Sequence, residues 1–216
     1  MVSSIDITDL ACPCLTKAQL HMLALGEVII ADFSESGVLW PAQDKTGLID
    51  FGPEDFRPRM RILREEWDRD SEITALHRAV LHGYLVRYAA NRLLIRDTLK
   101  RHPEILEEEI HRPIIVAGLP RSGTTHLVNL LAADRRFHSL PLWEAYEPLP
   151  FPGEVVEGNA PDPRYTRCAD AWETLRAGAP LIAAMHPMEP DHIHEDLELM
   201  GPDFASCGFE WLTLNP

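Results

Sequence analysis

A continuous apolar run leads directly into a glycine-bounded loop and then into a helical pattern. This order constrains the fold of the chain more than any other feature. The run is residues 113–119, PIIVAGL, and its β-branched side chains predict a buried strand of a parallel sheet. Leu127, Leu130 and Leu131 in the following THLVNLLAAD are spaced as one face of a helix. A strand that enters a helix N-terminus through a short loop predicts a crevice suited to an anion.

The loop itself, GLPRSGTT at residues 118–125, carries the groups that a phosphate needs. Its backbone N–H groups and the positive end of the helix dipole both face the crevice. Gly118 and Gly123 permit close approach of the backbone to a ligand. Three hydroxyl donors and one permanent cation complete the set: Ser122, Thr124, Thr125 and Arg121.

One alternative is a P-loop kinase or nucleotidase with an altered loop. Gly118 and Gly123 stand at the spacing of G-x-x-x-x-G-K-[ST], but Thr124 occupies the position of the lysine. In nucleoside triphosphatases that lysine reaches the terminal phosphates. The sequence also shows no strand that ends in the aspartate of a Walker B motif. Both departures disfavour this alternative.

The chain is predicted to have two parts, an N-terminal helical region over residues 1–111 and a domain over residues 112–216 that contains the loop. Apolar residues at three- and four-residue intervals predict a helix through TALHRAVLHGYLVRYAANRLLIRDTLKRH. Ser71 and Thr74 can cap its start, and Pro103 marks its end.

An earlier amphipathic stretch, PEDFRPRMRILREEWDRD, predicts a second helix that starts near Pro53. Arg61, Arg64 and Arg69 are expected on its solvated face, paired with nearby carboxylates. From residue 140 onward the chain is rich in proline, which breaks long helices. This last part predicts ordered loops and short helices over the mouth of the sheet.

Charge and hydropathy exclude several classes of protein. The net charge of −14 excludes general electrostatic binding to nucleic acid, because that mode needs a basic surface. The most apolar early stretch, HMLALGEVIIADF, is too short and too charged for a membrane span. The N-terminus lacks the pattern of a secretory signal, and Cys12 and Cys14 form a lone C-x-C without a second pair. We therefore expect a cytoplasmic protein with reduced thiols.

An ordered set of motifs resembles a known family. GLPRSGTT is similar to the 5′-phosphosulfate-binding loop of sulfotransferases that use 3′-phosphoadenosine-5′-phosphosulfate (PAPS). The set narrows the resemblance to bacterial sulfotransferase-family proteins with a helical region ahead of the loop. It runs from about Thr46 to the end: TGLIDFGPEDFRPRM, NRLLI, HPEI, RPIIVAGLPRSGTTHLVNLLAAD, LPLWEAYEPLP, DPR and HPMEPD. The resemblance implies an α/β fold, a P-loop-type three-layer parallel sheet preceded by the N-terminal helical region.

The resemblance also implies the reaction. A sulfuryl group moves from PAPS to a hydroxyl or amine of a small-molecule or lipid acceptor, and no metal is needed. Arg121 would stabilise the charge that grows on the bridging oxygen as the sulfuryl group leaves. The residues implied to hold the 5′-phosphosulfate are Pro120, Arg121, Ser122, Gly123, Thr124 and Thr125. The acceptor itself stays open among sterols, glycolipids, phenols and peptide hydroxyls.

The acceptor needs a base, and in several sulfotransferase branches this is a glutamate about twenty residues after the loop. Glu144 in LPLWEAYEP stands 144 − 121 = 23 residues after Arg121. Partial burial beside Trp143 would raise its pKa toward the working pH. Glu144 is therefore the first candidate, with Glu147 and His186 as alternatives.

The polar cluster HPMEPDHIHEDLELM supplies further candidates. Glu195 and Asp196 match an acidic pair of the family that would shape the acceptor side. Three histidines could suggest a metal, but a proline-broken loop is expected to set no ligand geometry: His186, His192 and His194. His126, just after the loop, is expected on the helix surface.

The segment that binds the 3′-phosphate of the cofactor in sulfotransferases has no counterpart in the sequence. We therefore expect an incomplete sheet and the N-terminal part of a longer protein, or a truncated product, that alone lacks activity. A third interpretation follows from this one. It is a non-catalytic fragment whose N-terminal helices serve for association into an oligomer.

Overall fold

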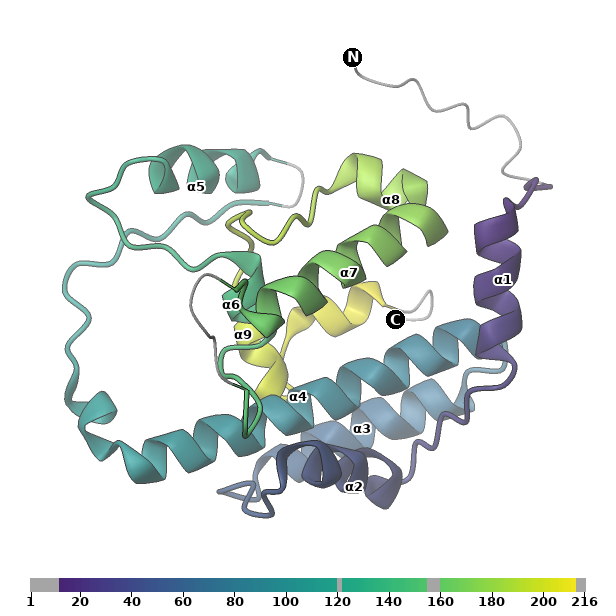
Figure 1. The fold of residues 1–216 in the computed structure, drawn as a ribbon, viewed down its shortest axis with the longest axis horizontal. Coiled ribbons are helices and arrows are strands. Elements are labelled where there is room, and N and C mark those ends of the chain that lie inside the picture. The colour runs from purple at the N-terminus through teal and green to yellow at the C-terminus, as the bar shows by residue number, and fades with distance from the viewer. Residues whose placement is uncertain (1–11, 120–121, 155–159, 213–216) are drawn as a thin grey trace.

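Helices and the loops between them make up the protein. A computed structural model describes residues 12–119, 122–154 and 160–212. Figure 1 shows α2, α3 and α4 side by side, with α6, α7 and α9 on one side of α4. The helix α5 lies apart from them, after a long extended connection (Figure 1). The elements are α1 (Lys17–Gly26), α2 (Glu35–Thr46), α3 (Phe56–Arg69), α4 (Ala75–Arg101), η1 (Pro103–Glu107), α5 (Thr124–Ala132), α6 (Leu142–Tyr146), α7 (Pro163–Gly178), α8 (Pro180–Met185), α9 (Leu197–Met200), η2 (Gly201–Asp203) and η3 (Cys207–Trp211).

The long helix α4 is the centre of the fold, and its ends follow from local sequence signals. Thr74 is the N-cap, and its hydroxyl accepts a hydrogen bond from the His77 N–H at 3.1 Å. Lys100 and Arg101 stand in the last turn, where positive charge favours the helix dipole, and Pro103 follows. The predicted helix is therefore confirmed, with Thr74 and not Ser71 as its cap.

The core combines residues from both ends of the chain. Leu81, Leu85 and Leu93 of α4 are fully buried against residues of α2 and α3. Phe204 and Phe209, more than a hundred residues further along the chain, belong to the same cluster. Phe204 stacks on Phe56 with ring centroids 5.8 Å apart. The segment around η2 and η3 is therefore packed onto the N-terminal helices. The division into domains at residues 111 and 112 stays a prediction.

A buried ion pair joins α9 to α4. Arg87 Nη1 lies 2.8 Å from Glu198 Oε2, and the two side chains are 10% and 11% exposed. The hydroxyl of Tyr88 donates to the same carboxylate oxygen at 3.1 Å. Burial lowers the pKa of Arg87, but Glu198 and the neighbouring Tyr146 and Tyr88 together outweigh burial and hold that pKa well above its usual value. Arg87 therefore remains charged inside the protein.

Aromatic rings surround the guanidinium of Arg87. Its central carbon lies 3.6 Å from the ring centroid of Tyr146, 4.5 Å from that of Tyr88 and 5.2 Å from that of Tyr84. Its Nη1 also donates to the Tyr146 carbonyl at 2.8 Å. Burial raises the pKa of Tyr84 to about 12, so this ring stays neutral. Because Tyr146 ends α6, Arg87 fixes α6 as well as α9 on α4.

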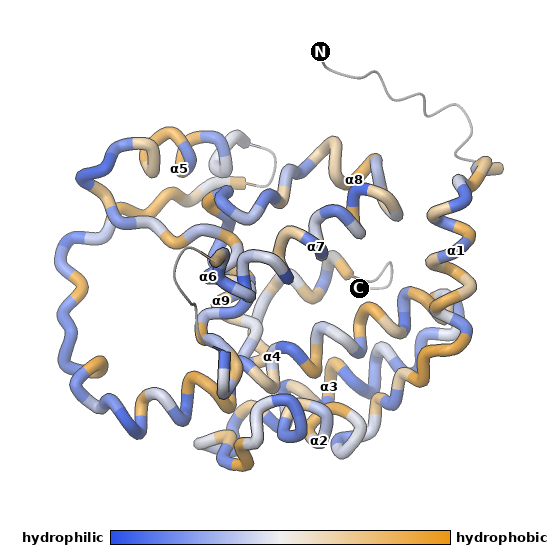
Figure 2. Tube along the Cα trace, viewed as in Figure 1, coloured by the Kyte–Doolittle hydropathy of each residue, from blue (hydrophilic) through white to orange (hydrophobic). Residues whose placement is uncertain are grey.

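The predicted α/β fold is wrong. Residues 113–119 form no strand, and the described residues contain no sheet, only an isolated antiparallel bridge between Pro141 and Ile193. The side chains of Ile115 and Leu119 are each 80% exposed. Figure 2 shows hydrophobic residues along this extended connection before α5. The apolar run has the composition of a buried strand, but a strand needs a neighbour for its backbone hydrogen bonds, and no described segment pairs with it.

The prediction for α3 is correct in part. The helix begins at Phe56, three residues after Pro53, and Arg61 and Arg69 form surface ion pairs with Glu65. Arg64 does not belong to that surface. It is buried, and its Nη1 donates to the Phe33 carbonyl at 2.5 Å. The amphipathic pattern could not show this, because a long arginine side chain can cover the core with its stem.

The prediction for the proline-rich last part is correct in part: it forms ordered loops and short helices, but α7 has 16 residues and the described residues contain no sheet for this part to cover. Asp162 caps α7 by accepting from the Arg164 N–H, and Pro163 occupies its first turn. Leu142, Ala145, Cys168 and Trp172 are buried on α6 and α7. None of the described helices is both long and apolar enough to cross a membrane.

The Arg87–Glu198 pair gives the first testable prediction. Glu198→Gln leaves a buried guanidinium without its counter-charge, so the free energy of unfolding should fall by about 3 kcal/mol or more. Chemical denaturation monitored by circular dichroism measures this loss. Glu173→Gln is the matched control, because its pair with Arg176 is largely exposed and its loss should change stability by less than about 0.5 kcal/mol. Equal losses of unfolding free energy in Glu198→Gln and Glu173→Gln would contradict the large stabilisation assigned to the buried pair.

Candidate functional site

The N-terminus of α5 is the candidate anion site. The helix begins at Thr124, as predicted, and Gly123 is its N-cap with φ 93° in the left-handed region. No side chain caps the helix. The first N–H groups of an α-helix have no partner within the helix, so those of α5 are available to a ligand. A nine-residue helix with an uncapped N-terminus favours an anion at this position.

The loop folds back on its own first glycine. A Cβ atom on Gly118 would lie 2.8 Å from Ser122 Oγ and 2.9 Å from Thr124 Cγ2. A larger residue would therefore push the two side chains apart. Ser122 is engaged within the loop, because its N–H and its hydroxyl both bond to the Leu119 carbonyl, at 3.1 Å and 2.6 Å. Ser122 is exposed, whereas Thr124 and Thr125 are partly buried.

Two side chains of α5 hold the segment before α9. The hydroxyl of Thr125 donates to Glu195 Oε1 at 2.7 Å. Asn129 makes a pair of bonds to one residue: its amide donates to the Ile193 carbonyl at 2.7 Å, and its oxygen accepts from the Ile193 N–H at 3.0 Å. The same amide also donates to the Thr125 carbonyl at 2.8 Å. This arrangement places the predicted acidic residue Glu195 directly beside the loop.

The same segment also bonds to α6, the helix that carries Glu144. Ile193 forms the isolated bridge with Pro141, and the Leu142 N–H donates to the His192 carbonyl at 2.9 Å. The Trp143 N–H donates to the Pro190 carbonyl at 3.1 Å. Residues 190–195 therefore join α5 on one side to α6 on the other. The loop, the acidic pair and the candidate base lie in connected parts of the structure.

Glu144 and Glu147 differ sharply in their surroundings. Glu144 is partly buried in α6, and its carboxylate makes no hydrogen bond or ion pair with another described residue. Glu147 is 6% exposed, and its Oε2 lies 2.6 Å from Arg167 Nη2. Arg167 also pairs with Glu154 at 2.5 Å. The carboxylate of Glu147 is therefore occupied by a structural ion pair, whereas that of Glu144 has no partner among these residues.

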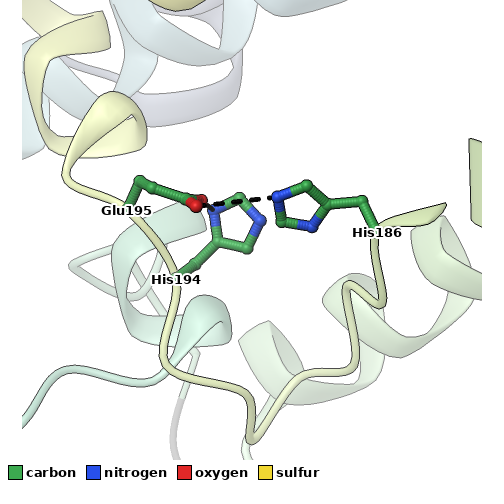
Figure 3. A group of neighbouring side chains, drawn as sticks. All are labelled: His186, His194 and Glu195. Carbon is green, nitrogen blue, oxygen red and sulfur yellow. Dashed lines mark ion pairs between the residues drawn. The ribbon is translucent and has the colours of Figure 1, made fainter. Parts of the chain in front are cut away.

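His186, His194 and Glu195 converge on one point (Figure 3). His194 Nδ1 lies 2.9 Å from Glu195 Oε2, and His186 Nε2 lies 3.6 Å from Glu195 Oε1. The imidazole of His194 and then the hydroxyl of Thr125 hold the pKa of Glu195 well below its usual value. Burial lowers the pKa of His192, whose ring lies nearby. The loop brings one possible ligand atom from each of His186, His194 and Glu195 within 4.8 Å of the others.

Sequence reasoning placed Pro120 and Arg121 in the loop, and both lie outside the described residues. His126 is exposed on α5, as expected. Asn129 was missed, although the sequence holds a signal for it. An asparagine in a short, otherwise apolar helix competes with the backbone for hydrogen bonds and needs a partner. The partner, Ile193, is 64 residues away and could not be named from the sequence.

The comparisons with known proteins agree with the motifs of the loop. Residues 113–216 match a family model described as "Sulfotransferase family". No curated protein matches the chain.

Two solved structures are similar to the chain. The crystal structure of sulfotransferase STF1 from Mycobacterium tuberculosis H37Rv has a TM-score of 0.65 and 25% identity, and the match covers 83% of this chain and 52% of that chain. The crystal structure of sulfotransferase STF9 from Mycobacterium avium has a TM-score of 0.68 and 24% identity, and the match covers 84% of this chain and 46% of that chain. The chain therefore spans about half the length of these two proteins.

The Asn129 contact gives the second prediction. Asn129→Ala removes the acceptor of the Ile193 N–H, and a hydrogen bond of about 1–1.5 kcal/mol corresponds to roughly tenfold faster local exchange. Hydrogen exchange measured by NMR at the Ile193 amide should show this increase. Thr174→Ala, which removes a hydroxyl bond within α7, should leave the Ile193 amide unchanged. An unchanged rate in Asn129→Ala would show that the segment is held by other contacts.

Proposed function

We propose that this chain, whose residues 113–216 match the sulfotransferase family model, transfers a sulfuryl group from PAPS to an acceptor. The acceptor is a hydroxyl or amine of a small molecule or lipid. The observation that carries the proposal is the uncapped N-terminus of α5, with Gly123 in the left-handed region and Thr124 and Thr125 in its first turn. A phosphosulfate is an anion of the size and charge that such a terminus favours.

Pro120, Arg121, Ser122, Gly123, Thr124 and Thr125 would hold the 5′-phosphosulfate. The residues fit this group because the first turn of α5 offers N–H groups without a side-chain cap and two threonine hydroxyls stand beside them. Bound PAPS would supply the activated sulfuryl group. Ser122 would have to exchange its bond to the Leu119 carbonyl for a bond to the ligand, and Thr125 would have to do the same with its bond to Glu195.

Arg121 and Glu144 would carry the chemistry on the protein side. As the acceptor oxygen or nitrogen forms its bond to sulfur, the bond between sulfur and the bridging oxygen breaks. Glu144 would take the proton of the acceptor, and Arg121 would stabilise the negative charge on the bridging oxygen. Glu144 is preferred to Glu147 because Arg167 already occupies the carboxylate of Glu147. The proposal includes a cytoplasmic setting, which keeps the exposed thiols of Cys12 and Cys207 reduced.

Binding calorimetry tests the proposal directly. The protein should bind adenosine 3′,5′-bisphosphate more tightly than ATP with magnesium, because Thr124 replaces the lysine that reaches the terminal phosphates of ATP. The reverse preference would favour a P-loop kinase or nucleotidase. Binding of neither nucleotide would contradict the proposal and favour a non-catalytic fragment that associates through its N-terminal helices.

Arg121 is expected to matter for the rate and not for folding. A charged donor at a developing anion contributes about 3 kcal/mol, so Arg121→Ala should lower turnover on the order of a hundredfold. Sulfuryl transfer from PAPS measures the rate, and thermal unfolding measures the stability. Exposed Arg135, just beyond α5, gives a control variant, Arg135→Ala, that should change neither quantity. Turnover of Arg121→Ala within a few-fold of the native rate would remove Arg121 from the mechanism.

Glu144→Gln keeps the shape of the side chain but cannot accept a proton. With a weakly acidic alcohol the rate should fall by roughly two to four powers of ten, and the affinity for PAPS should hardly change. The rate with a partly ionised phenol should fall less, because this acceptor needs less help from a base.

Glu147→Gln is the comparison. It should lower stability because the ion pair with Arg167 is lost. It should leave the difference in rate between the alcohol and the phenol as it is in the native protein. Glu147 would replace Glu144 as the proposed base if Glu147→Gln lowered the rate more with the alcohol than with the phenol and Glu144→Gln did not.

A further inference from the structure

Because Glu144 is the proposed base, the proposed transfer assigns no step to His186, His194 or Glu195, although His186 is an alternative base and Glu195 belongs to the acidic pair on the acceptor side. The three side chains are the group of possible metal ligands found among the described residues. Each offers one ligand atom, and these atoms lie within 4.8 Å of one another. We propose that the three side chains bind a divalent transition-metal ion of the zinc class. The inference concerns a site beyond the proposed reaction and does not depend on it.

The distances between the side chains suit such an ion. Two ligand atoms at about 2.1 Å from zinc in tetrahedral geometry are separated by roughly 3.4 Å. His194 Nδ1 lies 2.9 Å from Oε2 of the Glu195 carboxylate, and His186 Nε2 lies 3.6 Å from its Oε1. One ligand atom from each of the three residues lies within 4.8 Å of the other two. Figure 3 shows the Glu195 carboxylate beside the ring of His194, with the ring of His186 turned toward both. Small rotations of the side chains are enough to bring three ligands to one ion.

The hydrogen bonds of the cluster are incomplete in a way that an ion would explain. The side chain of His194 is 9% exposed, and neither of its ring nitrogens has a hydrogen-bond partner among the described residues. Its Nδ1 lies 2.9 Å from Glu195 Oε2, but the two atoms are not aligned as a hydrogen bond requires, and Oε2 is also without a partner. Buried polar atoms without partners cost about 1–3 kcal/mol each. A metal ion would satisfy one nitrogen of His194 and the oxygen of Glu195 together.

The surroundings of Glu195 resemble the outer shell of a metal site. Its Oε1 accepts a hydrogen bond from Thr125 at 2.7 Å, which leaves Oε2 for an ion. Ligating carboxylates in proteins are commonly held in this way by a second hydrogen bond. Asn129 fixes the backbone two residues before Glu195 through its bonds to Ile193. The ligand is therefore oriented by α5 before any ion binds.

The donor set selects the class of ion. Two imidazole nitrogens and one carboxylate suit zinc and its transition-metal neighbours, whereas calcium and magnesium prefer oxygen ligands throughout. A simple ion pair between a charged His194 and Glu195 would explain the contact between them but would leave His186 without a reason to face the same carboxylate. Three protein ligands also leave one tetrahedral position open for water or another small ligand.

Metal titration of the whole chain tests the proposal. Protein freed of metal by a chelator and then dialysed should bind one Zn²⁺ per chain in calorimetry. With Co²⁺ it should show the visible absorption of a tetrahedral site. Zn²⁺ should also raise the midpoint of thermal unfolding, because it binds the folded state. His186→Ala and Glu195→Gln should each lower the affinity at least tenfold. His186 is not deeply buried, so its variant should keep the fold even if a change at His194 does not.

Two controls separate this site from general surface binding. His111 Nε2 lies 3.2 Å from Glu109 Oε2, but this pair is exposed and has no third ligand, so His111→Ala should bind Zn²⁺ as the native protein does. The double change Cys12→Ser and Cys14→Ser should also leave binding intact. The proposal is overturned if the native protein binds no Zn²⁺ at micromolar concentrations. It is equally overturned if binding survives in His186→Ala and Glu195→Gln or disappears with the two cysteines.

Discussion

The buried contact between Arg87 and Glu198 is the constraint on which the arrangement of the site depends. A guanidinium inside the protein requires a carboxylate beside it, since an unpaired charge there costs several kcal/mol. This requirement fixes α9 on α4 and, through the Tyr146 carbonyl, also fixes the end of α6. Residues 190–195 run directly into α9 and bond to α6 and α5. One charge on the central helix therefore sets the position of a segment more than a hundred residues away.

Local signals predicted the helices, whereas the sheet depended on information that the sequence does not hold. Thr74 and Pro103 mark the ends of α4, and Gly123 marks the start of α5, because caps and helix breakers act within a few residues. Residues 113–119 have the composition of a buried strand, but composition cannot supply the neighbouring strand. In the described part of the chain these residues remain extended, unpaired and largely exposed.

The candidate site was predicted residue by residue but not as an arrangement. Thr125 and Glu195 were both named from motifs, and their 2.7 Å contact across 70 residues could not be. Likewise the sequence left Glu144 and Glu147 as rivals, and it could not show that Glu147 forms an ion pair with Arg167. His186 and His194 were set aside because prolines make a loop irregular. The sequence could not show that this segment is held by bonds to its neighbours, as Asn129 and Leu142 hold it.

The exposed connection ahead of α5 also bears on how the protein behaves at high concentration. Residues 113–119 carry no charged side chain, are rich in β-branched residues and present unpaired backbone groups. Such a segment is a template for pairing with the same segment of another molecule. The net charge of −14 opposes that encounter through repulsion between molecules. Salt screens this repulsion over about 10 Å at 0.1 M, so colloidal stability should decrease as ionic strength rises, although the fold itself does not change.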